Sequence, residues 1–378
     1  MIPLFRPSYD NEEVEAVAEA LRSGWVGLGP RTAQFEKEFA QYLGSPYCVA
    51  LNSGTAALHL ALLSLNLSKG DEVIVTPITF VSTAHVIRYV GATPVFADVE
   101  LDTLNIDPKD IDRKISDRTK AILVVHYGGH PCDMDVISKS AKNHGITVIE
   151  DAAHACGAEY KGRKVGTISP LTCFSFHAVK NLATGEGGAI TFQESKLDPY
   201  FREMRWMGIS KDTWDRTSKG EVYAWKYTVN RLGFKYHMHD ISAAIGLVQL
   251  HKLDKNNDRR RAIAAKYSRE LKDLDWIEVP VEKSYAKSSW HIYRITLPNL
   301  KMRDALIGHL KQKDISPGVH YYPINLYPYY DQSKHTTPVA SQVWERILSI
   351  PMFPDLTEQQ QDYIIQAIKS FPANKYQS

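Results

Sequence analysis

The chain has 378 residues, of which 44% are hydrophobic, and this is enough apolar material for a large hydrophobic core. Its 45 basic and 43 acidic residues give a formal net charge of +2, so the overall charge does not favour binding to nucleic acid or to a membrane surface. The four cysteines lack metal-ligand spacing, and neither a signal peptide nor a membrane-spanning apolar stretch is evident, so we expect a soluble cytoplasmic protein without a metal.

Apolar segments rich in β-branched residues alternate with amphipathic segments along most of the chain. Residues 10–24 predict a helix, because Asp10 and Glu13 form a capping-box pattern and Gly24 follows the last apolar position. We expect further helices at 53–67, 84–91 and 133–145, and extended segments at 71–80, 93–99, 119–129, 146–154, 171–178 and 187–193. This alternation predicts an α/β fold with a mostly parallel central sheet flanked by helices.

The pattern changes after about residue 250. A long charged helix at 247–274 precedes a strand at 288–297, a helix at 303–314 and a terminal helix at 357–371. Three consecutive arginines at 259–261 fall in the long helix, and we interpret them as part of a solvated face. We therefore expect a large α/β domain at residues 1–248 and a smaller α+β domain at residues 249–378.

Lys180 is a candidate reactive group because it follows the apolar run CFSF and precedes the glycine-rich TGEGG. In a partly desolvated cleft its pKa would be lowered, which favours the neutral amine that forms a Schiff base with an aldehyde. The alternative is a lysine that extends from a loop into solvent. The position of Lys180 in the sequence, taken alone, favours the lysine in solvent over the reactive lysine.

Two further signals complement Lys180. Asp151 ends the extended segment ITVIED, where a carboxylate either caps a helix or keeps a pyridine nitrogen protonated. Ser53, Gly54 and Thr55 open a predicted helix, where hydroxyls and free backbone N–H groups either cradle a phosphate or cap the helix. Together these groups would converge at one edge of the sheet, as expected of a site for an aldehyde–phosphate cofactor.

The sequence resembles the DegT/DnrJ/EryC1/StrS family of sugar aminotransferases, which belong to the aspartate aminotransferase-like superfamily of fold type I. The resemblance extends over almost the whole chain. It implies the use of pyridoxal 5'-phosphate (PLP), bound by the large domain. The matching stretches include GWVGLGPRTAQFEKEF, ALNSGTAALHLAL, GDEVIVTPITFVSTAHVI, VIEDAAHACGAEYKGRKVGT, FSFHAVKNLATGEGGAI, LGFKYHMHDISAAIGLVQL and VHYYPINLYPYY.

The resemblance also assigns roles to individual residues. Lys180 matches the lysine that carries PLP as a Schiff base and moves the proton, and Asp151 matches the partner of the pyridine nitrogen. His154 stands where glutamine is common and would contact the cofactor ring. Phe80 matches an aromatic residue stacked on that ring, although without the resemblance we would expect this side chain in the hydrophobic core.

Phosphate contacts follow from the same comparison. Gly54, Thr55 and Ser175 match phosphate ligands. Lys235 matches a position, commonly asparagine, that reaches the phosphate from a neighbouring subunit, so the resemblance implies a homodimer with shared active sites. With a lysine at this position, the sequence resembles the subgroup that includes the lipid A aminoarabinose transaminases.

Substrate contacts are expected at Trp25, His320 and Tyr321, and in the polar, aromatic segment 211–227. The resemblance implies transfer from L-glutamate to a nucleotide-linked keto-6-deoxy sugar, with C4 favoured over C3. The nucleotide is left open. Three alternatives stay open too: an aminocyclitol-forming transaminase acting on a keto-inositol, a PLP-dependent dehydratase or lyase, and a non-catalytic PLP-binding protein. Lysine rather than histidine at position 180 disfavours the dehydratase.

Overall fold

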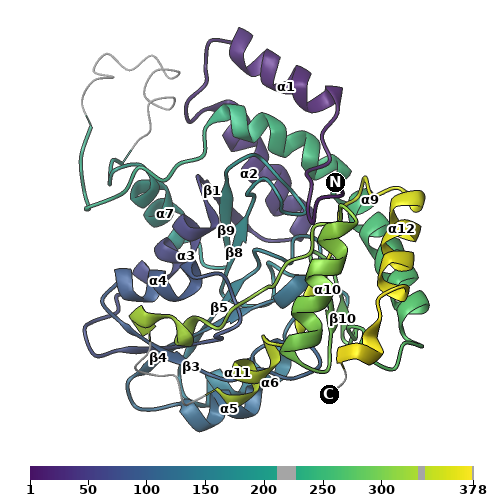
Figure 1. Ribbon diagram of the computed structural model, residues 1–378. Coiled ribbons are helices and arrows are strands. Elements are labelled where there is room, and N and C mark those ends of the chain that lie inside the picture. The colour runs from purple at the N-terminus through teal and green to yellow at the C-terminus, as the bar shows by residue number, and fades with distance from the viewer. Residues whose placement is uncertain (211–226, 331–336, 377–378) are drawn as a thin grey trace.

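A computed structural model describes residues 1–210, 227–330 and 337–376 (Figure 1). Its centre is a seven-stranded sheet in the order β1-β9-β8-β5-β4-β2-β3. β9 is antiparallel to both neighbours, and the other neighbouring pairs are parallel. The prediction of a mostly parallel sheet is confirmed. The strands are β1 (Tyr47–Leu51), β2 (Glu72–Val75), β3 (Thr93–Phe96), β4 (Thr119–Val125), β5 (Thr147–Asp151), β8 (Leu171–Ser175) and β9 (Gly188–Phe192).

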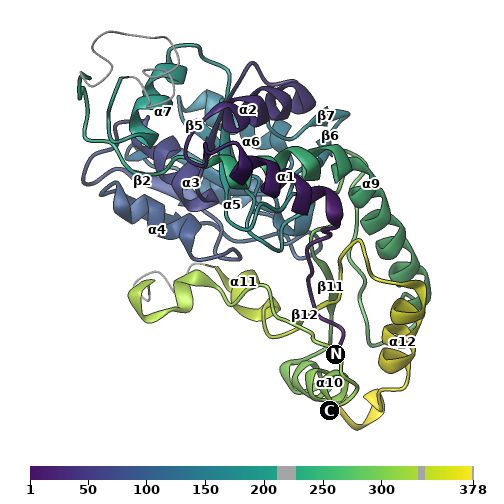
Figure 2. The same cartoon turned by 90° about the horizontal axis from the view of Figure 1, so that it is seen from above.

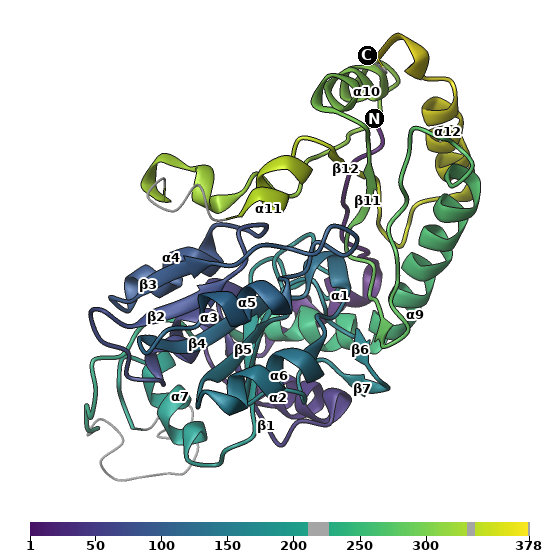
Figure 3. The same ribbon diagram turned by 90° about the horizontal axis from the view of Figure 1, so that it is seen from below.

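Helices cover both faces of this sheet. Their apolar side chains pack in separate clusters because alternate strand residues point to opposite faces: Val49 and Leu51 pack with α3, α4 and α7, whereas Cys48 and Ala50 pack with α2. α5 and α6 cover the second face beside α2, as Figure 3 shows. The helices are α1 (Asn11–Arg22), α2 (Pro30–Leu43), α3 (Gly54–Leu63), α4 (Ser82–Tyr89), α5 (Pro108–Lys114), α6 (Met134–Asn143) and α7 (Leu197–Arg205).

The first helix shows how local sequence fixes an element boundary. The Asp10 side chain accepts a hydrogen bond from the backbone N–H of Glu12 at 2.9 Å, and the Glu13 carboxylate accepts one from the backbone N–H of Asp10 at 2.8 Å. The predicted capping box is therefore confirmed.

The C-terminal elements form a second apolar cluster beside the sheet (Figure 2). α9 (Asp240–Leu271) runs from the sheet to α12 without interruption and contains the predicted domain boundary at residues 248 and 249. The division into two domains stays a prediction, with α9 as their connection. The remaining elements are β11 (Tyr293–Thr296), β12 (Ile347–Ile350), α10 (Leu300–Gln312), α11 (Pro338–Val343), α12 (Glu358–Lys369), the short strands β6 (Glu159–Tyr160), β7 (Arg163–Lys164) and β10 (Ala286–Lys287), and the 3-10 turns η1 (Tyr127–Gly129), η2 (Ile324–Leu326) and η4 (Ala373–Tyr376).

The interpretation of the three arginines as a solvated face is wrong for Arg260. This side chain is 1% exposed and donates through Nη1 to the carbonyl oxygen of Met352 at 3.0 Å. Burial lowers its pKa to about 9. The face of α9 that carries Arg260 also carries Ile263 and Tyr267, and it packs on the C-terminal core instead of facing water.

None of the described helices combines the length and apolarity that a transmembrane span requires. Within the same residues, no group of His, Cys, Asp and Glu side chains is arranged to hold a metal ion.

Candidate active site

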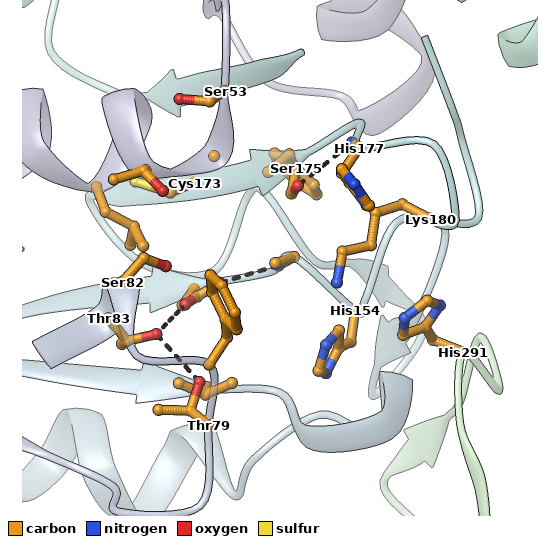
Figure 4. Close-up of a pocket in the computed structure, with 18 of the residues that line it drawn as sticks. Ser53, Thr79, Ser82, Thr83, His154, Cys173, Ser175, His177, Lys180 and His291 are labelled. Carbon is orange, nitrogen blue, oxygen red and sulfur yellow. Dashed lines mark hydrogen bonds between the residues drawn. The ribbon is translucent and has the colours of Figure 1, made fainter. Parts of the chain in front are cut away.

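A cavity of about 520 Å³ lies at the carboxyl ends of β4, β5 and β8 (Figure 4). Val125, Asp151 and Ser175, the last residues of these strands, form part of its wall. The C-terminal part of the chain contributes His291, His320 and Tyr321. The cavity brings together nine of the predicted site residues: Gly54, Thr55, Phe80, Asp151, His154, Ser175, Lys180, His320 and Tyr321.

Lys180 extends into this cavity from the segment after β8, toward His154 and His291 (Figure 4). Its backbone N–H donates to the carbonyl oxygen of His177 at 2.8 Å, which forms a tight turn that directs the side chain inward. Burial lowers the pKa of Lys180 to about 8, and the Asp151 carboxylate partly opposes this effect. The alternative of a lysine extending into open solvent is therefore not supported.

Asp151 is buried at the end of β5 and accepts two hydrogen bonds. Its Oδ1 accepts from the backbone N–H of Ala153 at 3.0 Å, and its Oδ2 accepts from the Thr83 hydroxyl at 2.9 Å. Burial raises the pKa of Asp151, while these two hydrogen bonds and the Lys180 ammonium act in the opposite direction. The element that follows Asp151 in the chain is the short strand β6 and not a helix, so its alternative role as a helix cap is wrong.

The first turn of α3 faces the same cavity. The Ser53 hydroxyl accepts a hydrogen bond from the backbone N–H of Ala56 at 3.1 Å, so the capping interpretation is correct for this residue. A Cβ atom at Gly54 would lie 2.8 Å from Cβ of Ser175, and one at Gly188 would lie 2.4 Å from the Ser53 backbone. Glycine at both positions lets the helix start approach β8 and β9. The first-turn N–H groups at Gly54 and Thr55 lack helical acceptors and suit a phosphate.

His154 and Phe80 border the centre of the cavity. The buried His154 has its Nε2 3.1 Å from the Tyr321 hydroxyl, and its Nδ1 has no hydrogen-bond partner within the described residues. Phe80 is 58% exposed although it follows a buried strand, so the prediction of a core position from its sequence alone is wrong. An exposed aromatic ring at a cavity leaves one face available for stacking.

These groups fit PLP as a set. A buried carboxylate suits a protonated ring nitrogen, an amine with a lowered pKa suits an aldehyde, and the start of α3 suits a phosphate. The unsatisfied Nδ1 of His154 is a further polar group for which a bound molecule would supply the partner.

Two predicted site residues lie outside the cavity of their own chain. The ammonium of Lys235 is 3.5 Å from the ring centre of Trp206, and the indole N–H of Trp25 donates to the carbonyl oxygen of Leu28 at 2.9 Å. A reach of Lys235 into a second subunit stays a prediction, as does a substrate contact by Trp25. The predicted substrate segment 211–227 lies, except for Tyr227, outside the described residues.

Sequence reasoning missed several residues of the cavity wall. Thr83 could have been found, because it lies three residues after Phe80 in a segment that the family resemblance had already placed at the site. His291 and Phe5 gave no such signal, since each is distant in sequence from the strand ends. The wall residues that were missed include Phe5, Thr79, Ser82, Thr83, His177, Glu186 and His291.

Comparisons with known proteins agree with this geometry. The model of the DegT/DnrJ/EryC1/StrS aminotransferase family matches residues 7–369. The uncharacterized protein MJ1066 of Methanocaldococcus jannaschii is 43% identical, with 97% of each chain covered. The spore coat polysaccharide biosynthesis protein SpsC of Bacillus subtilis is 41% identical, covering 97% of this chain and 96% of SpsC. The putative sugar aminotransferase Spr1654 from Streptococcus pneumoniae, in its PMP-form, superimposes with a TM-score of 0.93 at 32% identity, covering 99% and 100% of the two chains.

Proposed function

Because the chain belongs to the DegT/DnrJ/EryC1/StrS aminotransferase family, we propose that it transfers the amino group of L-glutamate to a nucleotide-linked keto-6-deoxy sugar, with C4 favoured over C3. It is a PLP-dependent sugar aminotransferase. The main support for the proposal is that Lys180, Asp151 and the start of α3 surround a single cavity. Position 180, where a Schiff base would form, is a lysine. The product would be an amino-sugar nucleotide for polysaccharide, glycan or antibiotic synthesis.

The roles proposed for individual residues follow from their chemistry. PLP, when bound, supplies a ring that draws electron density away from the carbon that loses a proton. Asp151 would keep a proton on the ring nitrogen, and Lys180 would carry a proton on Nζ between the amino-bearing carbon of the substrate and the cofactor. A lysine pKa of about 8 supports this role, because such an amine exchanges its proton readily near neutral pH. Gly54, Thr55 and Ser175 would bind the phosphate.

The sugar would enter from the side of the C-terminal elements. His320 and Tyr321 line the cavity there, which supports their proposed contact with substrate. Tyr321 also holds His154 through its hydroxyl, so a change at either residue would affect the other. Trp25 and the segment 211–227 would complete the substrate site.

We further propose a homodimer in which Lys235 of each subunit reaches the phosphate site of the other. A dimer of Lys180→Ala subunits or of Lys235→Ala subunits would then be weakly active or inactive. In an equal mixture of the two variants, half of the dimers contain one subunit of each kind, and each such dimer has one site with both lysines. Mixing should therefore restore about a quarter of wild-type activity. Absence of any restoration after verified subunit exchange would contradict the shared site.

A two-step assay tests the reaction itself. The PLP-loaded protein is first treated with L-glutamate, and the excess is removed. Uridine-, thymidine- and guanosine-linked 4-keto- and 3-keto-6-deoxy sugars and a keto-inositol are then added separately while the visible cofactor absorbance is followed. Recovery of absorbance with one nucleotide sugar supports the proposal and identifies the acceptor. Recovery with the keto-inositol alone identifies an aminocyclitol-forming enzyme, and no response to glutamate contradicts the proposed donor.

Lys180→Ala provides the matching control in this assay. It should abolish turnover while the phosphate and ring contacts retain part of the cofactor affinity, measured by fluorescence titration with PLP. Undiminished turnover would refute the proposed role of Lys180.

A further inference from the structure

His291 is a cavity residue whose ring stacks against two other rings. Its imidazole stacks on Phe5 at a centroid distance of 5.2 Å and on His154 at 4.6 Å. The residue is only 2% exposed, yet it forms part of the cavity wall. Stacking uses the faces of the ring, so a hydrogen bond to a ligand would be made at its edge, where the two nitrogens lie.

The position of the proton on the His291 ring follows from the orientation of two side-chain amides, those of Asn181 and Asn257. Asn181, the residue after Lys180, lies 2.8 Å from the carbonyl oxygen of Ser289, which accepts hydrogen bonds only. The atom of Asn181 that faces Ser289 is therefore Nδ2, and it also donates to Oδ1 of Asn257 at 2.8 Å. Asn257 is oriented in the same way, because its Nδ2 donates to the carbonyl oxygen of Cys156 at 3.0 Å.

The orientation of Asn181 leaves its Oδ1 facing Nδ1 of His291 at 3.0 Å. An amide oxygen only accepts, so Nδ1 of His291 must carry the proton and donate it. Burial, together with the nearby Lys180 ammonium, places the pKa of His291 well below its usual range, so the ring carries one proton at neutral pH. Its Nε2 is then a lone-pair acceptor, and among the described residues the hydrogen bond of this ring is the one made by Nδ1.

The three other cavity histidines are not fixed in this way. Nε2 of His177 is 3.8 Å from a carboxylate oxygen of Glu186, which is too far for a hydrogen bond. His154 faces the Tyr321 hydroxyl and His320 faces the Ser349 hydroxyl, and a hydroxyl can either donate or accept. His291 is thus distinguished by a tautomer that the surrounding protein specifies.

We propose that His291 is a substrate-contacting residue whose Nε2 accepts a hydrogen bond from a hydroxyl group of the sugar, with Asn181 as the positioning residue that sets its tautomer. This inference rests on the proposed function. An acceptor nitrogen repels the lone pairs of a carboxylate, so the two carboxylates of glutamate cannot pair with it. The amino group of glutamate can donate, but it is the group that is transferred, whereas the sugar carries hydroxyl donors that the reaction leaves in place.

Two measurements on the PLP-loaded protein test this proposal. The first is long-range ¹H–¹⁵N NMR with ¹⁵N-labelled histidine, in which the His291 signal is identified by its loss in His291→Asn. The proposal requires the Nδ1–H tautomer. The Nε2–H tautomer would overturn it.

The second measurement separates the two half-reactions of His291→Asn. The asparagine amide can replace Nδ1 as the donor to Asn181 but has no counterpart of Nε2. We expect KM for the sugar acceptor that the two-step assay identifies to rise about 5- to 30-fold, as for one lost hydrogen bond, with the glutamate half-reaction changed less than about twofold. Equal losses in both half-reactions, or a loss with glutamate alone, would overturn the contact with the sugar.

The outcomes distinguish this inference from the proposed function. A wild-type protein that reacts with no nucleotide sugar contradicts the proposed function, and with it the sugar contact. A wild-type protein that reacts normally, while His291→Asn leaves the sugar half-reaction unchanged, contradicts the role of His291 alone.

Discussion

Replacement of Lys180 by methionine should stabilise the protein in the absence of PLP. The folded chain holds this lysine in a site that lowers its pKa from 10.5 to about 8. A pKa difference of one corresponds to about 1.4 kcal/mol, so the charged lysine costs the folded state roughly 3 kcal/mol at pH 7. Methionine keeps the apolar stem without the charge. The pKa of about 8 already includes the opposing attraction of Asp151, so we expect a net gain of roughly 3 kcal/mol in the free energy of unfolding.

The pH dependence of this gain identifies its cause. Below pH 8 the lysine is protonated in both the folded and the unfolded chain, so the full cost is present. Between about pH 8 and 10.5 the unfolded chain binds more protons than the folded chain, and wild-type stability rises with pH relative to the variant. The advantage of Lys180→Met should therefore be constant below pH 8 and should disappear toward pH 10.5.

Urea unfolding of the PLP-free proteins at pH 7, 8, 9 and 10 measures these differences. Lys139→Met is a suitable control, because Lys139 is exposed on α6 and its replacement should change the free energy of unfolding by less than about 0.5 kcal/mol. A Lys180→Met protein that is no more stable than wild type at pH 7, or whose advantage at pH 10 is as large as at pH 7, would refute the argument that burial lowers the lysine pKa.

Three other changes should affect the site in defined ways. Asp151→Asn should reduce the turnover rate by about 10²-fold or more, and a near-normal rate would refute the role of this carboxylate. Thr83→Val removes a hydrogen bond that lowers the pKa of Asp151, so the acidic limb of the rate–pH profile should move to higher pH, and Thr83→Ser should restore it; an unchanged limb would contradict this coupling. Gly54→Ala should weaken PLP binding in a fluorescence titration, because the new Cβ would lie 2.8 Å from Cβ of Ser175, whereas Gly308→Ala on the exposed side of α10 should leave it unchanged; equal effects would contradict the steric argument.

Local sequence patterns predicted the secondary structure well where the interactions involved only residues close together in the sequence. The capping box at Asp10 and Glu13 needs only neighbours within one helical turn, and the apolar runs of β4 and β5 identify buried strands by composition. Lys180 and Asp151 were found because each follows a strand, and the carboxyl ends of parallel strands meet at one edge of a sheet.

Burial in the C-terminal part was harder to predict. Arg260 lies in a charged run that is typical of a solvated helix, yet it faces the core, because α9 packs against elements more than 80 residues later in the chain. Phe80 shows the opposite error: its apolar neighbours indicate a core position, but the strand has already ended and the ring stands at the cavity.

The sequence by itself determined the order of helices and strands, the type of sheet and the reactive groups on adjacent strand ends. Only the tertiary structure decided which side chains complete the cavity, since His291 is brought to Asn181 across 110 positions of sequence. The physical reason is the range of the interactions. Helix capping and strand periodicity act between near neighbours, whereas the tautomer of His291 depends on hydrogen bonds that exist only after distant segments have packed together.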